Sequence, residues 1–236
     1  MNEIGKIQSF LETVGYEQKR CKCFGIETGQ NPFITISRET GAGGHSVSAA
    51  ILKEMEEEKS PFFQGWQVCD QELCKRITEE PDLRVSMQKL LASEYHSQIE
   101  DMIEEMIAGD SPQDTVVKRM FKIIRTLATF GKVIVIGRAG GCVTRDLPLG
   151  IHIRLIASLP SRIKRIMLRH NMDEKHAKQF ILEQDKSRKN LVKKFFNRDI
   201  ADPLLYDMVF NTDKMLVEDI GHSIVSMMTK KQPVCH

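Results

Sequence analysis

The sequence predicts an α/β protein with three layers, in which a five-stranded parallel sheet lies between two layers of helices. Two observations lead to this fold class. Short apolar segments rich in Val, Ile and Phe alternate along the chain with longer segments of helical periodicity, as in sheets whose parallel strands are joined by helices. Residues 133–136 are apolar at every position, which is typical of a strand covered by helices on both faces.

Each predicted strand is short, is rich in β-branched or aromatic residues and ends at a glycine or a polar side chain. The strands are predicted at residues 33–36, 65–69, 132–136, 150–157 and 208–210. Because ligands bind beyond the carboxyl ends of parallel strands, the polar and glycine-rich segments that follow these strands are the candidate site residues.

Between the strands, apolar residues recur every three or four positions, which indicates amphipathic helices. The helices are predicted at residues 46–58, 72–78, 83–108, 115–130, 160–170, 173–195 and 216–228. Pro81 is expected to end the second of them, and Gly131 is expected to cap the fourth.

We expect residues 1–30 to be an N-terminal helical appendage and residues 31–230 to be the main domain. Apolar residues between positions 4 and 14 recur at helical spacing. Cys21 and Cys23 have no second cysteine pair nearby, so we interpret them as thiols in a loop and not as zinc ligands.

The chain has 236 residues, with 34 lysines and arginines against 32 aspartates and glutamates. This near balance argues against a nucleic-acid partner, although acidic residues dominate 79–110 and basic residues dominate 162–198. There is no run of about 18 apolar residues and no signal peptide, so we expect a cytoplasmic protein without a membrane partner. The cysteines are interpreted as reduced thiols, and the oligomeric state is left open.

A glycine-rich loop, residues 41–44, lies between the first predicted strand and the first predicted helix. Glycines let successive backbone N–H groups point into one concavity, where the helix N-terminus adds positive potential, so the loop can hold a phosphate. The loop also fits a tight turn without a ligand. It does not satisfy the full G-x-x-x-x-G-K-[ST] pattern, because Gly44 stands where the lysine should be.

Several segments of the chain, in the same order, resemble those of cytidylate-kinase-like proteins, a branch of the nucleoside monophosphate kinases. They are residues 34–44, 69–73, 133–139 and 157–165, then Asp185 with Arg188, and residues 202–212. The resemblance covers roughly residues 33–228 and implies a phosphate-binding-loop (P-loop) kinase fold with a helical lid at about 183–203.

This resemblance implies an enzyme that transfers the γ-phosphoryl group of ATP, with Mg²⁺, to CMP, dCMP or a related small acceptor. Its partners would then be small-molecule nucleotides. Such chemistry needs two nucleotides held in line and positive charge on the phosphate oxygens, which arginine supplies in pairs of bonds. The alternative is a catalytically weak or inactive nucleotide-binding module on the same fold, acting as a sensor or partner protein.

The resemblance also assigns candidate roles to residues. The ATP side is formed by Thr40, Gly41, Ala42, Gly43, Gly44, His45, Ser46 and Arg162, with Ser46 as the Mg²⁺ ligand. The acceptor side is formed by Asp70, Arg138, Asp185, Arg188 and Lys189. The residues expected to act on the transferred group are Arg38, Arg138 and Arg188.

Two departures from the cytidylate kinases proper bear on catalysis. Those proteins have a lysine where this chain has Gly44 and a glycine where it has Arg38, so Arg38 is the candidate to replace the lysine charge. Ile136 stands where they have an aspartate, so Asp70 would have to assist the metal or the acceptor.

Several of these basic and acidic residues also have a purely structural interpretation. Asp70 is favoured as a helix N-cap. At least half of Arg162, Lys164, Arg165 and Arg169 are expected to lie on a solvated helix face. For Lys193 and Lys194, a solvated position and a contact in the lid are equally expected.

Overall fold

The computed structural model describes residues 8, 10–13, 31–91, 101–104, 107 and 111–230. Within these residues, one parallel sheet has the strand order β2-β3-β1-β4-β5. The strands are β1 (Phe33–Arg38), β2 (Gln67–Cys69), β3 (Val133–Ile136), β4 (Gly150–Ile156) and β5 (Met208–Asn211). The predicted five-stranded parallel sheet is therefore confirmed, with each strand within two residues of its expected start.

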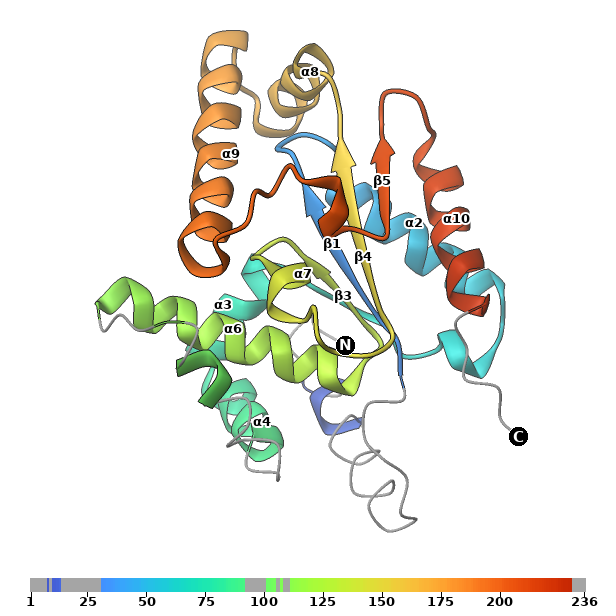
Figure 1. Ribbon diagram of the computed structural model, residues 1–236. Helices are drawn as coiled ribbons and strands as arrows, with labels where there is room; N and C mark the ends of the chain where they lie inside the picture. The colour runs from blue at the N-terminus through green and yellow to red at the C-terminus, as the bar shows by residue number, and fades with distance from the viewer. Residues whose placement is uncertain are drawn as a thin grey trace.

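Helices cover both faces of this sheet, which confirms the three layers (Figure 1). One face carries α2 (Gly44–Glu57) and α10 (Val217–Lys230). The other carries α3 (Gln71–Glu79), α4 (Pro81–Leu91), α6 (Pro112–Phe130) and the short α7 (Gly140–Val143). Two more helices, α8 (Leu159–His170) and α9 (Glu174–Phe196), stand at the carboxyl ends of the strands.

The alternation of side chains along the strands divides the core in two. Ile34 and Ile36 of the central strand β1 pack with α2 and α10, while Phe33 packs on the opposite face with α6. Phe10 and Leu11 from the N-terminal segment join this second cluster, with 8% and 1% of their surface exposed. Residues 10–13 are helical and pack on the same core as α3, α4 and α6.

Some element boundaries differ from the predicted ones. The helix predicted at residues 83–108 does not reach its expected end, because Ile107 is outside any helix. Residues 92–100 lie outside the described part of the chain, as do Cys21 and Cys23. Pro81 does end α3, and it also opens α4, since a proline needs no N–H partner in the first turn. The short α7 and two 3₁₀ turns, η1 (Pro61–Phe63) and η2 (Pro203–Leu205), were not predicted.

The short connections set the positions of the strand ends. Gly131 caps α6 as predicted, with φ of 77°, and its N–H bonds back to Leu127 O at 3.0 Å. Across the sheet, Ile34 of β1 pairs with Ile134 of β3 and with Ile151 of β4. This register brings the ends of β1, β3 and β4 to one edge of the molecule.

Among the described residues, no helix is long and apolar enough to cross a membrane.

Replacing Gly131 with alanine tests the close approach at the α6 cap. A Cβ there would lie 2.3 Å from Asn31 O, whereas a Cβ on Gly65, which has a similar φ of 80°, meets no described atom within 4 Å. We expect Gly65→Ala to lower the free energy of unfolding by about 1 kcal/mol through backbone strain, and Gly131→Ala to lower it by about 3 kcal/mol because the clash adds to the strain. Denaturant titration measures both, and equal losses would contradict this packing.

Candidate active site

In the structure, residues 39–43 join β1 to α2, and Gly44 of the predicted glycine-rich loop is the first residue of that helix. This connection, called the glycine loop below, has the geometry of a phosphate cradle. Gly41 and Gly43 have φ of 83° and 87°, and a Cβ on Gly41 would lie 2.8 Å from Arg162 O. No side chain caps the first turn of α2, so the N–H groups that begin this helix are open to a ligand. Because N–H groups at a helix N-terminus favour an anion, the loop is suited to phosphate.

The Asp185 carboxylate on α9 connects this loop to the helices above it. Thr40 donates to Asp185 Oδ1 from both its backbone nitrogen and its hydroxyl, each at 2.8 Å. Arg188 Nη2 donates to Oδ1 at 2.6 Å and Arg162 Nη1 donates to Oδ2 at 2.7 Å, while Arg188 also contacts the Thr40 hydroxyl. Burial would raise the pKa of Asp185, but the hydrogen bonds from Thr40, Arg188 and Arg162 more than offset it and hold the pKa below its ordinary value.

The Arg38 side chain lies in the space above Gly44 and beside Gly137. A Cβ on Gly44 would lie 3.4 Å from Arg38 Cγ, and a Cβ on Gly137 would lie 1.6 Å from Arg38 Nη1. A side chain on Gly137 would therefore clash with the Arg38 guanidinium, whereas a Cβ on Gly44 would only make ordinary van der Waals contact with the Arg38 methylenes. Burial, together with the positive charges of Arg188 and Arg138, lowers the pKa of Arg38 to about 10.

Arg138 follows β3 directly and adds a third positive charge to the cluster of Arg38, Arg138 and Arg188. Burial and then the charge of Arg188 lower its pKa, although nearby Cys74 and Asp70 oppose the shift. In the described part of the chain, no carboxylate lies within 4 Å of the guanidinium of Arg38 or of Arg138. Because like charges that are held together and partly buried need an opposite charge, the cluster is suited to a phosphate.

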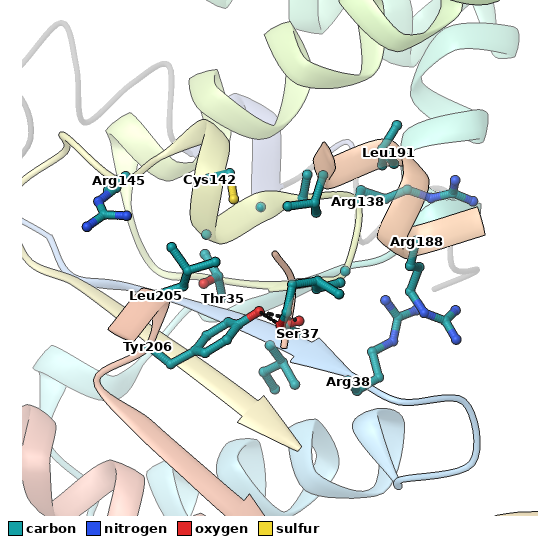
Figure 2. A pocket seen from close by; sticks show the side chains of 17 residues that line it. Thr35, Ser37, Arg38, Arg138, Cys142, Arg145, Arg188, Leu191, Leu205 and Tyr206 are labelled. Atoms are coloured by element: carbon teal, nitrogen blue, oxygen red, sulfur yellow. Dashed lines mark hydrogen bonds between the residues drawn. The ribbon is translucent and has the colours of Figure 1, made fainter. Parts of the chain in front are cut away.

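These three arginines line one side of a pocket beyond the carboxyl ends of β1 and β3, and Figure 2 shows how their side chains lie in it. The opposite wall comes from α7 and η2. Ser37 of β1 also lines the pocket, and its Oγ lies 3.1 Å from the Tyr206 hydroxyl. The sequence analysis did not single out Ser37 or Tyr206, although both lie in segments that carry the family resemblance.

A second group of residues contacts the loop from α8 and from the end of β5. Arg165 donates to Gly41 O at 3.2 Å and to the Thr212 hydroxyl at 2.9 Å, and Arg162 lies 3.6 Å from Glu39. Glu39 and Thr212 were not predicted as site residues, although each directly follows a strand and lies in a segment that carries the family resemblance. Of the four basic residues on α8, Arg162 and Arg165 bond to the loop region, whereas Lys164 and Arg169 are exposed.

Other predicted site residues lie apart from the cluster. Lys189 is exposed on α9. Lys193 donates to Asn197 Oδ1 and Lys194 to Asp114 Oδ1, both at 2.7 Å, so Lys194 ties α9 to α6. Neither contact involves the glycine loop, which favours the structural interpretation of both lysines.

Asp70 and His45 lie beside the first turn of α2. Asp70 caps α3, as predicted, because its carboxylate accepts from Leu73 N at 3.0 Å. It also lies 3.9 Å from His45 Nδ1, and burial followed by the charge of Arg169 lowers the pKa of that histidine. Ser46 is exposed in the same turn. No group of three or more His, Cys, Asp or Glu side chains in the described residues forms a metal site. Mg²⁺ bound mainly through nucleotide phosphates needs only one or two protein oxygens, which the predicted residues Ser46 and Asp70 would have to supply.

The family model of the cytidylate kinase-like family matches residues 33–214. A cytidylate kinase from Sulfolobus acidocaldarius is 31% identical over 113 residues, which are 48% of this chain and 59% of that protein. A cytidylate kinase from Methanosarcina barkeri is 25% identical over 184 residues, which are 77% of this chain and 87% of that protein. The alignment thus spans about three fifths of the Sulfolobus relative and most of the Methanosarcina one.

The solved structure of an uncharacterized protein from Eubacterium ventriosum shares the fold, with a TM-score of 0.62 and 22% sequence identity over 85% of this chain and 99% of that one. The family match extends from β1 through the glycine loop, Arg138, Asp185 and Arg188, which are the residues that the fold brings together. The chain therefore belongs to the cytidylate kinase-like family.

Proposed function

We propose that this protein transfers the γ-phosphoryl group of ATP, with Mg²⁺, to a nucleoside monophosphate, and that CMP or dCMP is an acceptor. The observation that carries the proposal is the cluster of Arg38, Arg138 and Arg188 beside a glycine loop that opens a helix. The relatives named cytidylate kinase support the choice of acceptor.

The proposed reaction follows from these positions. An oxygen of the acceptor phosphate attacks the γ-phosphorus of ATP, the bond to the bridging oxygen breaks, and ADP leaves. Backbone N–H groups at the start of α2 hold the donor phosphates, and Arg138 holds the acceptor phosphate. Mg²⁺, held by phosphate oxygens with Ser46 and Asp70, would neutralise charge on the donor. Arg38 lies between the two sides and stabilises the charge that develops on the transferred group.

The position of Arg38 bears on the missing lysine. Its Cγ and Cδ lie 3.4 and 3.6 Å from the place of a Cβ on Gly44, so the arginine lies directly beside the position from which a lysine would extend. We infer that Arg38 supplies the charge that the cytidylate kinases proper take from lysine. A binding module without catalysis would not need this charge so close to both phosphate sites.

Replacing Arg138 with alanine tests the acceptor site. Loss of a charged hydrogen-bond donor to phosphate removes about 1.5–3 kcal/mol, so we expect the KM for CMP to rise about 10- to 100-fold while the KM for ATP changes less than twofold. A coupled assay of ADP formation measures both constants. Arg119→Ala, which removes an exposed arginine from α6, is the charge-matched control. An unchanged KM for CMP would place the acceptor elsewhere.

Exchanging the residue types at positions 38 and 44 tests the role of Arg38. We expect Arg38→Gly to lower kcat about 10²–10³-fold because it removes charge at the transferred group, and Gly44→Lys alone to lower activity because the new side chain is crowded by Arg38. The double variant frees that space, so we expect it to recover at least about tenfold over Arg38→Gly.

The same assay separates the alternative function. If the unchanged protein binds ATP in calorimetry but forms no ADP with any nucleoside monophosphate, while the double variant is active, the natural protein is a nucleotide-binding module. If the double variant is no better than Arg38→Gly, Arg38 does not stand in for the lysine.

Asp185→Asn tests the connection between the lid and the loop. Because the folded-state pKa of Asp185 is depressed, its charge stabilises the fold above the unfolded-state pKa, and this contribution is lost as pH falls through the folded-state value. We expect the variant to lose about 1–2 kcal/mol of unfolding free energy at pH 7, and the difference from the unchanged protein to shrink below about pH 4. Denaturant titrations at pH 7, 5 and 3.5 measure this difference, and a loss that is constant with pH would contradict it.

A further inference from the structure

Residues 197–206, called the return segment here, lead the chain from the end of α9 back to β5, and much of their surface is exposed. Leu204 is 84% exposed, and residues 197–199 are exposed as well. Among the described residues, the backbone N–H groups of the return segment bond within it or back to α9, as from Asn197 N to Lys193 O at 3.1 Å. Its position beside the sheet therefore depends on the side chains that it directs inward.

Tyr206, at the end of the return segment, connects it to the sheet through a hydroxyl group. Figure 2 shows this hydroxyl directed toward Ser37, with the two oxygens 3.1 Å apart. The same hydroxyl lies 2.8 Å from Ile200 O, six positions back in the return segment. One hydroxyl thus closes the return segment on itself and ties it to β1. Because Ser37 directly precedes Arg38, the tie reaches the strand end that enters the glycine loop.

A buried cation lies behind this tie. Arg154 on β4 is 7% exposed, and no carboxylate in the described part of the chain pairs with it. Its Nη1 donates to Ser37 Oγ at 3.1 Å, and its guanidinium lies 5.7 Å from the centre of the Tyr206 ring. Because a buried charge is costly unless it is compensated, these contacts of Arg154 favour the observed positions of both side chains.

The donors and acceptors allow one direction for this chain of hydrogen bonds. An arginine can only donate and a carbonyl can only accept, so Arg154 donates to Ser37 and Tyr206 donates to Ile200 O. The Ser37 hydroxyl then donates to the Tyr206 oxygen. Hydrogen bonds in such a chain polarise and strengthen one another, here from a buried cation to a carbonyl of the return segment. Burial raises the pKa of Tyr206, so the hydroxyl keeps its proton near neutral pH.

The helices above the glycine loop pack on each other through a small core of their own. This core consists of Ile163 and Ile166 of α8 with Ala177 and Ile181 of α9, and Figure 1 shows both helices beyond the carboxyl ends of the strands. Asp185 and Arg188 connect α9 to the glycine loop from the front. The return segment leaves the end of α9, so a fixed return segment limits the positions that α9 can take.

We propose that Tyr206 is a positioning residue that anchors the return segment to Ser37 and thereby holds α9, with Arg188, over the glycine loop. Arg154 acts through Ser37 and Tyr206 and does not touch the nucleotides. The proposal rests on the proposed phosphoryl transfer and deepens it, because it adds residues that act on the reaction through Arg188.

Removing single hydroxyl groups tests this anchor without a large disturbance of the fold, since Tyr206→Phe keeps the ring beside Arg154. We expect Tyr206→Phe and Ser37→Ala each to lower kcat with CMP about 3- to 10-fold, as for the loss of one hydrogen bond. The Kd for ATP from titration calorimetry should change less than twofold, because the glycine loop is unaltered. Both variants break one chain, so we expect the double variant to lose no more than either alone. Ser223→Ala, which removes a hydroxyl from α10, is the control.

Hydrogen exchange of the full chain without nucleotide measures the anchor separately from catalysis. We expect the amides of residues 200–206 to exchange at least about threefold faster in both variants, while those of α2 and α10 keep their rates. Unchanged exchange in residues 200–206, or faster exchange throughout the domain, would overturn the proposal. So would an unchanged kcat, or losses that multiply in the double variant. If the unchanged protein forms no ADP with any acceptor but the variants release the return segment, the proposed function fails and the anchor stands.

Discussion

A single carboxylate, that of Asp185, holds the candidate active site together. It accepts hydrogen bonds from Thr40 in the glycine loop and from Arg162 and Arg188 on two different helices. Without a negative charge at this point, the positive charges of α8 and α9 would be held over a loop that is itself positive at the helix N-terminus. The pKa of Asp185 is depressed, which shows that these hydrogen bonds favour the charged carboxylate in the folded protein in spite of its burial. The same hydrogen bonds hold α9 in place beside the glycine loop, and residues of α9 line one side of the pocket.

Positions 38, 44 and 137 form one physical unit, although they belong to different segments. Arg38 extends between two glycines, and a side chain on either one would meet it. The parallel pairing of β1 with β3 makes this possible, since it sets Ile36 beside Ile136 and brings Gly137 next to the start of the loop. Under the proposed function, Arg38 brings to the start of the loop the positive charge that a lysine at position 44 would supply.

The sheet could be predicted from the sequence because buried parallel strands are apolar throughout. The glycine loop could be predicted because its glycines stand between a strand pattern and a helix pattern. Arg138, Asp185 and Arg188 were predicted from the family resemblance. The wall of the pocket was missed for a physical reason. Ser37 contacts Arg154 and Tyr206, which lie 117 and 169 positions away, and no local pattern marks such contacts. The burial of Phe10 and Leu11 on the main core was missed for the same reason, since a short amphipathic segment does not show what it packs against.

The excess of basic residues between positions 162 and 198 divides into two uses. Arg162, Arg165 and Arg188 bond to the glycine loop or to its partners, whereas Lys193 and Lys194 bond to Asn197 and Asp114 away from it. Under the proposed function, arginine suits the positions around the loop better than lysine, because the planar fork that now binds the Asp185 carboxylate also matches the geometry of phosphate oxygens.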